Sequence, residues 1–285
     1  MPSYTTLINS QQLATLLLKG PAVALLDCRF DLAAPDSGEA SYLAGHLPDA
    51  QYLHLDRDLS GAKTGFNGRH PLPDRDALAS RLRQLGVQHG QQVVIYDAQG
   101  GMFAARVWWL LRWLGHSAVA VLDGGLSAWQ AAGHTLQIQT TPPAPGSFES
   151  AAALVATVER DALLRNVQSE GPLTIIDARS ADRFRGENET LDARAGHIPG
   201  ARNRFFRDNL KASGQFKPAA LLREEFQALL GGDDARTSVQ QCGSGVTACH
   251  NLLALEIAGL EGSRLYPGSW SEWSSDGEAP IATGA

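Results

Sequence analysis

The sequence of 285 residues has few cysteines, no excess of positive charge and no long apolar run. The three cysteines Cys28, Cys242 and Cys249 are too few for a disulfide framework, which is typical of a reducing compartment. A net charge of -6 argues against a nucleic-acid surface or a polybasic membrane patch. The densest apolar run is interrupted by Arg112 and is much shorter than the roughly 20 residues of a membrane span. Residues 1–20 show no charged leader before a continuous apolar run, so we predict a cytoplasmic protein with neither nucleic-acid nor membrane partners.

The chain contains two copies of one pattern. Four segments recur in the same order in both halves: LLDCRF and IIDARS from Leu25 and Ile175, GHLPDA and GHIPGA from Gly45 and Gly196, VVIYDAQGG and SVQQCGSGV from Val93 and Ser238, and DGGLSAW and PGSWSEW from Asp123 and Pro267. Four ordered matches indicate a duplicated domain of roughly 140 residues, which is an ordinary domain size. A content of 44% hydrophobic residues is enough to fill two such cores.

Residues 140–150, TTPPAPGSFES, separate the two copies and are rich in proline and small residues, which suits an extended linker. We therefore predict a first domain over residues 1–139 and a second over residues 151–285. Within each copy, short β-rich runs such as VVIYD alternate with helical patterns such as DALASRLRQLG. This alternation predicts an α/β fold in which each domain is a mostly parallel sheet covered by helices on both faces. In such sheets, ligands bind beyond the carboxyl ends of the strands.

Only the second copy has a cysteine at the end of its central strand. Cys242 aligns with Asp97 of the first copy, so a structural need shared by both copies does not explain the thiol. The loop GSGVT follows Cys242 and leads directly into a helical pattern, which places backbone N–H groups and the positive end of a helix around the sulfur. Because such surroundings favour a thiolate, we predict that Cys242 is a nucleophile. Cys28 and Cys249 are expected to be small buried hydrophobic residues.

Three chemistries use an anion-binding loop of this kind. A cysteine phosphatase needs an arginine at the end of the loop, where Ala248 stands. The string GSGVTA matches the glycine pattern of a dinucleotide site, with Glu261 as the ribose acid, but too few residues follow Gly243 for the rest of such a fold. The third chemistry is the stabilisation of a sulfur anion or persulfide, which the loop suits.

The segments CGSGVTAC, GHIPGA with GHLPDA, DAR with DCR, and LYPGSWSEW resemble the rhodanese superfamily, and specifically the 3-mercaptopyruvate sulfurtransferases. The resemblance covers essentially the whole chain and implies two tandem rhodanese-like domains, of which the first lacks the catalytic cysteine. Thiosulfate-using relatives typically carry basic residues just after the cysteine, whereas Gly243 and Ser244 stand here. A neutral loop compensates a dianion less well, so the expected main donor is the monoanionic keto acid, with thiosulfate as a secondary donor.

The resemblance also implies a mechanism. Cys242 takes the sulfur of 3-mercaptopyruvate as a persulfide and releases pyruvate, with no metal and no organic cofactor. An acceptor then removes the sulfur: a thiol such as thioredoxin or a low-molecular-weight thiol, or cyanide. A relay of Ser244, His70 and Asp58 is expected to move the proton that the departing enolate needs.

The substrate carboxylate requires a fork of donors, and the resemblance assigns this role to Arg183, with Arg194 as the candidate for a second arginine. The remaining substrate-binding candidates lie in the loop itself: Gly243, Gly245, Val246 and Thr247. The Thr247 hydroxyl is expected to face the sulfur or to cap the following helix.

A second hypothesis is a persulfide carrier that binds a partner protein and receives its sulfur from another enzyme. Nothing in the loop around Cys242 excludes this role. A carrier has little reason to present His70 and Arg183 to a small keto acid, and these two residues therefore favour the enzyme.

Overall fold

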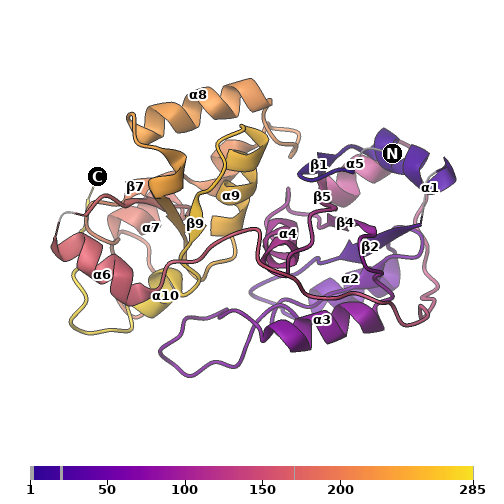
Figure 1. The fold of residues 1–285 in the computed structure, drawn as a ribbon, viewed down its shortest axis with the longest axis horizontal. Helices are drawn as coiled ribbons and strands as arrows, with labels where there is room; N and C mark the ends of the chain where they lie inside the picture. The colour runs from indigo at the N-terminus through magenta and orange to yellow at the C-terminus, as the bar shows by residue number, and fades with distance from the viewer. Residues whose placement is uncertain (1–2, 20–21, 170, 285) are drawn as a thin grey trace. The chain divides into compact units, whose positions relative to one another are not determined.

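A computed structural model describes residues 3–19, 22–169 and 171–284 (Figure 1). The chain forms two compact units: unit 1 is Met1–Ser60, Pro73–Leu154 and Ala212–Phe216, and unit 2 is Gly61–Leu72, Val155–Lys211 and Lys217–Ala285. These units differ from the predicted division into residues 1–139, 140–150 and 151–285. The expected linker belongs with unit 1, and the loop Gly61–Leu72 from the first sequence copy belongs with unit 2.

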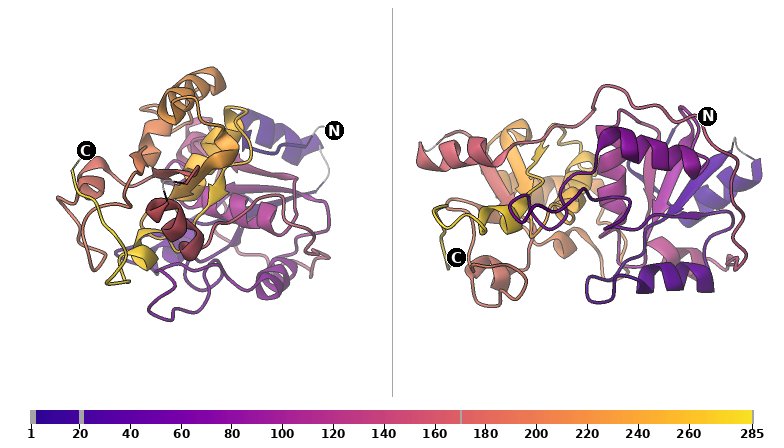
Figure 2. Two further views of the ribbon diagram at one scale, coloured as in Figure 1. Left: turned by 60° about the vertical axis from the view of Figure 1, so that its left-hand side comes forward. Right: turned by 90° about the horizontal axis from the view of Figure 1, so that it is seen from below.

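Unit 1 contains a five-stranded sheet in the order β1-β5-β4-β2-β3, and all of its strand pairs are parallel. The strands are β1 (Leu7–Ile8), β2 (Val23–Asp27), β3 (Gln51–Tyr52), β4 (Gln92–Tyr96) and β5 (Val119–Leu122). The helices α1 (Ser10–Lys19), α2 (Ser37–Ala44), α3 (Arg75–Gln84), α4 (Ala104–Trp113) and α5 (Gly125–Ala131) lie on both sides of this sheet (Figure 1, Figure 2). β5 is buried along its whole length, as expected for a parallel strand that is covered on both faces.

Unit 2 repeats this order. Its strands are β6 (Thr174–Asp177), β7 (Arg202–Asn203), β8 (Ser238–Gln241) and β9 (Arg264–Leu265), in the order β7-β6-β8-β9, and Thr157 forms a parallel bridge to Leu265 at the position that β1 has in unit 1. The helical segments are α6 (Arg160–Gln168), α7 (Ala181–Arg185), η1 (Phe206–Asn209), α8 (Ala219–Leu230), η2 (Ala235–Thr237), α9 (Ala248–Ile257) and α10 (Ser269–Trp273). The predicted duplicated α/β fold is confirmed. Among the described residues, no helix has the length and apolarity that crossing a membrane requires.

The repeated DxR and GHxP segments form a buried clamp. In unit 2 the Asp177 carboxylate accepts hydrogen bonds from the backbone N–H of Arg179 at 2.9 Å and from its guanidinium at 2.7 Å. Arg179 Nη2 also donates to the carbonyl oxygen of Gly196 at 2.7 Å. Unit 1 contains the same three contacts among the corresponding residues Asp27, Arg29 and Gly45. These repeats therefore connect the end of a strand to a later loop. Because both units contain the same contacts, the repeated residues stabilise the fold of each unit.

The loop after β4 encloses the carboxylate of Asp97. Four backbone N–H groups donate to its two oxygens at 2.8–3.0 Å, and they belong to Gln99, Gly101, Phe103 and Ala104. Oriented N–H groups in a loop that precedes a helix form an anion-binding site. Since Cys242 is the counterpart of Asp97, unit 1 shows that a loop of this construction binds a negatively charged side chain.

Replacing Asp97 is expected to destabilise unit 1. In Asp97→Ala, four buried N–H donors lose their acceptor, so we expect the free energy of unfolding to fall by roughly 3 kcal/mol or more. Urea denaturation followed by circular dichroism measures this loss. The exposed Asp36, whose side chain makes no capping hydrogen bond to α2, provides the control, and Asp36→Ala should change stability by less than about 0.5 kcal/mol. Equal stability of the two variants would contradict the structural role of Asp97.

Candidate active site

Cys242 directly follows β8 and is only 2% exposed. The backbone N–H of Ser244 faces its sulfur at 3.5 Å, as the corresponding N–H of Gln99 faces Asp97 in unit 1. Gly245 has a φ angle of 76°, and a Cβ atom there would lie 2.3 Å from the carbonyl oxygen of Pro267. The tight turn therefore requires glycine at this position, and it delivers the chain to the start of α9.

The last repeated segment, PGSWSEW, fixes the backbone around the sulfur. The N–H of Cys242 donates to Ser269 Oγ at 3.1 Å, and the carbonyl oxygen of Cys242 accepts from the N–H of Trp270 at 3.0 Å. The carbonyl oxygen of Gly243 accepts from the N–H of Ser271 at 2.9 Å. These three bonds hold the cysteine loop against the beginning of α10, so its position is set by the fold.

His70 and Ser244 form a buried hydrogen-bonded pair. His70 Nδ1 lies 2.7 Å from Ser244 Oγ, and the two residues are 5% and 7% exposed. The loop that carries His70 is anchored in the same unit, because the N–H of Arg69 donates to Ser271 Oγ at 3.0 Å. The structure thus brings together two of the three residues expected in the relay. A hydroxyl bonded to an imidazole is a suitable group for proton transfer.

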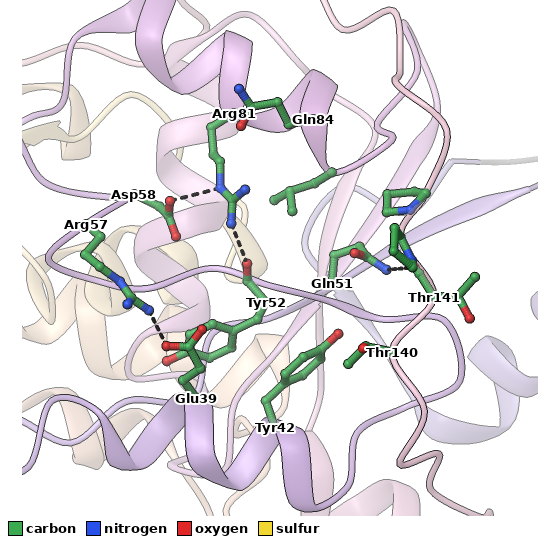
Figure 3. Close-up of a pocket in the computed structure, with 13 residues that line it drawn as sticks. Glu39, Tyr42, Gln51, Tyr52, Arg57, Asp58, Arg81, Gln84, Thr140 and Thr141 are labelled. Atoms are coloured by element: carbon green, nitrogen blue, oxygen red, sulfur yellow. Dashed lines mark hydrogen bonds and ion pairs between the residues drawn. The ribbon is translucent and has the colours of Figure 1, made fainter.

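Asp58, the third residue expected in the relay, lies in unit 1 and has other partners. Its Oδ2 accepts from the N–H of His54 at 2.8 Å, and its Oδ1 accepts from Arg81 Nε at 2.9 Å. Figure 3 shows Asp58 and Arg81 at the edge of a cavity of about 540 Å³ formed by α2, β3, α3 and residues 140–143. These contacts support a structural role for Asp58, and its part in the relay stays a prediction.

Arg183 borders the cysteine loop. A Cβ atom on Gly243 would lie 3.6 Å from both terminal nitrogens of the Arg183 guanidinium. The guanidinium is held by Glu189, with Nη2 2.8 Å from Oε1, and lies 3.3 Å from Asp192 Oδ2. An arginine fixed by carboxylates beside the predicted nucleophile is a suitable group to bind the carboxylate of a substrate.

Arg69 is a second arginine at the loop, and sequence reasoning missed it. Its Nη2 would lie 2.8 Å from a Cβ atom on Gly243, so an alanine there would displace the guanidinium. Arg69 also forms an ion pair with Asp192. Its position next to His70 could have indicated this place, because a loop that positions one side chain at the site also brings the neighbouring residue close.

Arg194, the candidate for a second substrate arginine, has its partners in the C-terminal segment of unit 2, and its role at the substrate stays a prediction. Its Nη1 and Nη2 donate to the carbonyl oxygens of Asp276 and Ala279, at 2.5 and 2.8 Å. Its own carbonyl oxygen accepts from Trp270 Nε1 at 2.9 Å. Arg194 therefore fastens the C-terminal segment of unit 2, and the observed second arginine at the loop is Arg69.

The other loop residues shape the start of α9. Val246 is buried, and its carbonyl oxygen accepts from the N–H of Cys249 at 3.1 Å. Thr247 stands at the N-cap position of α9, but its hydroxyl makes no capping hydrogen bond to the described residues, so the expectation of a side-chain cap is wrong. The expectation that its hydroxyl faces the sulfur stays a prediction.

Comparison with known proteins identifies the fold. The family model of the rhodanese-like domain matches residues 10–132 and 159–276, which covers the core of both units. The chain belongs to the rhodanese family. A 3-mercaptopyruvate sulfurtransferase described as probable, from Pseudomonas aeruginosa, is 46% identical over 284 residues and spans 99% of both chains. The putative thiosulfate sulfurtransferase SseB of Mycobacterium tuberculosis is 39% identical over 281 residues, covering 98% of this chain and 97% of SseB.

The crystal structure of SseA from Escherichia coli, described among the 3-mercaptopyruvate sulfotransferases, superposes with a TM-score of 0.79 at 32% identity. The superposition covers 94% of this chain and 100% of SseA. The tandem rhodanese architecture is therefore shown by sequence and by structure, and relatives named for either sulfur donor align along almost the whole chain.

The other two cysteines of this rhodanese are buried and donate to backbone carbonyls. Cys28 Sγ donates to the oxygen of Tyr96 at 3.2 Å, and Cys249 Sγ donates to the oxygen of Gly245 at 3.3 Å. Burial raises the pKa of the Cys28 thiol well above its usual value, and the carboxylate of Asp97 raises it further. Cys28 is thus protonated at neutral pH and unreactive.

Proposed function

We propose that the protein is a 3-mercaptopyruvate sulfurtransferase that carries the transferred sulfur on Cys242. The observation that carries this proposal is the 2.7 Å contact between Ser244 Oγ and His70 Nδ1 next to the cysteine loop. Breaking the carbon–sulfur bond of 3-mercaptopyruvate leaves an enolate that needs a proton, whereas thiosulfate releases sulfite, which needs none. A hydroxyl bonded to an imidazole supplies that proton.

In the first half-reaction, the Cys242 thiolate attacks the sulfur atom of 3-mercaptopyruvate. A sulfur–sulfur bond forms, the carbon–sulfur bond breaks, and its electron pair passes to the enolate of pyruvate. Ser244 donates its hydroxyl proton to the enolate and recovers a proton from His70. The products are pyruvate and a persulfide on Cys242. The outer S–H of this persulfide releases its proton to solvent, from which His70 regains the proton that it gave up, and the loop N–H groups and the start of α9 stabilise the negative charge that remains.

The substrate carboxylate binds beside Gly243, within reach of the Arg183 and Arg69 guanidiniums. Charge-assisted hydrogen bonds from a planar guanidinium hold a carboxylate in a fixed orientation. This contact places the reacting sulfur of the substrate next to the Cys242 sulfur, and holding the two atoms in line lowers the barrier to the reaction.

In the second half-reaction, an acceptor attacks the outer sulfur of the persulfide and regenerates the Cys242 thiolate. A thiol such as thioredoxin, a low-molecular-weight thiol and cyanide are all nucleophiles of the required kind. The low cysteine content supports a cytoplasmic location, which stays a prediction.

Steady-state kinetics with two donors test the proposal. We expect kcat/KM for 3-mercaptopyruvate to exceed that for thiosulfate by about tenfold or more, equivalent to about 1.4 kcal/mol in the transition state. Pyruvate release measures the first donor, and thiocyanate formation from cyanide measures both. A preference for thiosulfate would instead support a thiosulfate sulfurtransferase, and failure of both donors to load Cys242 would support a persulfide carrier.

A further inference from the structure

Two buried carboxylates face the arginines at the cysteine loop. Glu189 and Asp192 lie between α7 and β7, and their side chains are 2% and 3% exposed. Both contact Arg183, and Asp192 also pairs with Arg69. Burying a carboxylate is costly unless it is paired, so two such groups beside a site for an anionic substrate require an explanation.

Glu189 has a structural explanation. Its Oε1 accepts from the N–H groups of Leu191 and Asp192 at 2.9 and 3.2 Å, and its Oε2 contacts Arg179 at 3.3 Å. Arg179 belongs to the clamp that is present in both units. Glu189 therefore folds its own loop and ties this loop to the clamp, with Arg183 as an additional partner.

Asp192 has a different set of contacts. Its carboxylate joins the two loop arginines, with Oδ1 on Arg69 and Oδ2 3.3 Å from Arg183. Burial raises the pKa of Asp192, as does the nearby Glu189, while Arg69 and Arg183 act in the opposite direction. The two arginine contacts therefore offset the cost of burying this carboxylate only in part.

The charges around Gly243 balance. Arg69 and Arg183 contribute two positive charges, and their partners Glu189 and Asp192 contribute two negative charges. Arg179, which also contacts Glu189, is neutralised by Asp177. The single carboxylate of a monoanionic donor can bind one guanidinium that also contacts the buried carboxylates. A dianionic donor must enter beside Asp192 with no net positive charge to compensate it, and like charges at short range in a buried site repel strongly.

We propose that Asp192 determines donor specificity by cancelling one arginine charge at the cysteine loop, so that the site accepts monoanionic sulfur donors and disfavours the thiosulfate dianion. This inference rests on the proposed function and assigns the preference to one residue. Asp192 acts through Arg69 and Arg183, and it is not itself a group that reacts.

The variant Asp192→Asn tests this inference, because it removes the charge and keeps the shape and one hydrogen-bonding oxygen. We expect kcat/KM for thiosulfate to rise about tenfold, while kcat/KM for 3-mercaptopyruvate changes by less than about threefold. Glu187→Gln is the matched control, since it removes the same charge from an exposed ion pair with Arg185 on the same loop. This control should leave the ratio of the two donors unchanged.

A binding measurement separates this inference from the proposed function. Inorganic sulfate, a dianion, should protect Cys242 of Asp192→Asn from alkylation by iodoacetamide at about tenfold lower concentration than in the unmodified protein. Pyruvate, a monoanion, should protect both proteins at similar concentrations. Failure of the unmodified protein to release pyruvate from 3-mercaptopyruvate would refute the proposed function. The difference in sulfate protection between the two proteins would still support the role of Asp192. An unchanged sulfate dependence, or a parallel loss of both donor activities, would overturn the role of Asp192.

Discussion

Cys242→Ser is expected to abolish pyruvate release from 3-mercaptopyruvate, with a loss of at least about a thousandfold. A serine hydroxyl remains protonated at neutral pH and cannot hold a second sulfur atom as a persulfide. The measurement is pyruvate release under single-turnover conditions, together with the mass of the peptide that contains residue 242. The unmodified protein should gain one sulfur atom on this peptide, and the variant should gain none.

Cys249→Ser is the matched control for this experiment. Cys249 lies on α9 just after the same loop, and its thiol donates to the carbonyl oxygen of Gly245, a bond that a serine hydroxyl can also make. We expect this variant to keep pyruvate release within about threefold of the unmodified protein. Full activity in Cys242→Ser, or equal losses in the two variants, would refute Cys242 as the sulfur carrier.

Ser244→Ala should slow turnover of 3-mercaptopyruvate by about a hundredfold and affect thiosulfate by less than about fivefold. Only the keto acid leaves an enolate that must be protonated, and the variant removes the hydroxyl bonded to His70 at 2.7 Å. Parallel assays of pyruvate and thiocyanate measure the difference between the donors.

Ser275→Ala serves as the control for the lost hydroxyl. Ser275 is partly buried and donates to the carbonyl oxygen of Glu272 at 2.7 Å, so its hydroxyl has a backbone partner in place of an imidazole. It should leave both activities near those of the unmodified protein. Equal losses for the two donors in Ser244→Ala would show that Ser244 supports the loop and moves no proton.

The features that the sequence predicted correctly depend on local patterns. The alternation of strands and helices and the four ordered repeats predict the duplicated parallel sheets, because periodicity and repetition are visible in one chain. The loop after Cys242 is also local, since a strand, two glycines and a helix follow one another directly.

The features that the sequence did not predict depend on long-range contacts between irregular loops. Arg69 and Asp192 are 123 residues apart, and neither lies in a periodic segment. The assignment of residues 61–72 to the second unit has the same cause, because a loop without periodic pattern carries no signal of its packing partner. The contacts of Arg194 are of the same long-range kind, because its guanidinium donates to backbone carbonyl groups 82 and 85 residues away.

The carboxylate enclosed in unit 1 has a consequence for the sulfur-loaded state of unit 2. In aspartate the charged atom is separated from Cβ by one atom, and in a cysteine persulfide the terminal sulfur is separated from Cβ by one atom as well. Asp97, with its four N–H donors, is thus an oxygen analogue of the covalent intermediate that we propose for Cys242. If the proposal is correct, the first unit holds permanently the charge arrangement that the second unit forms only while Cys242 carries the transferred sulfur.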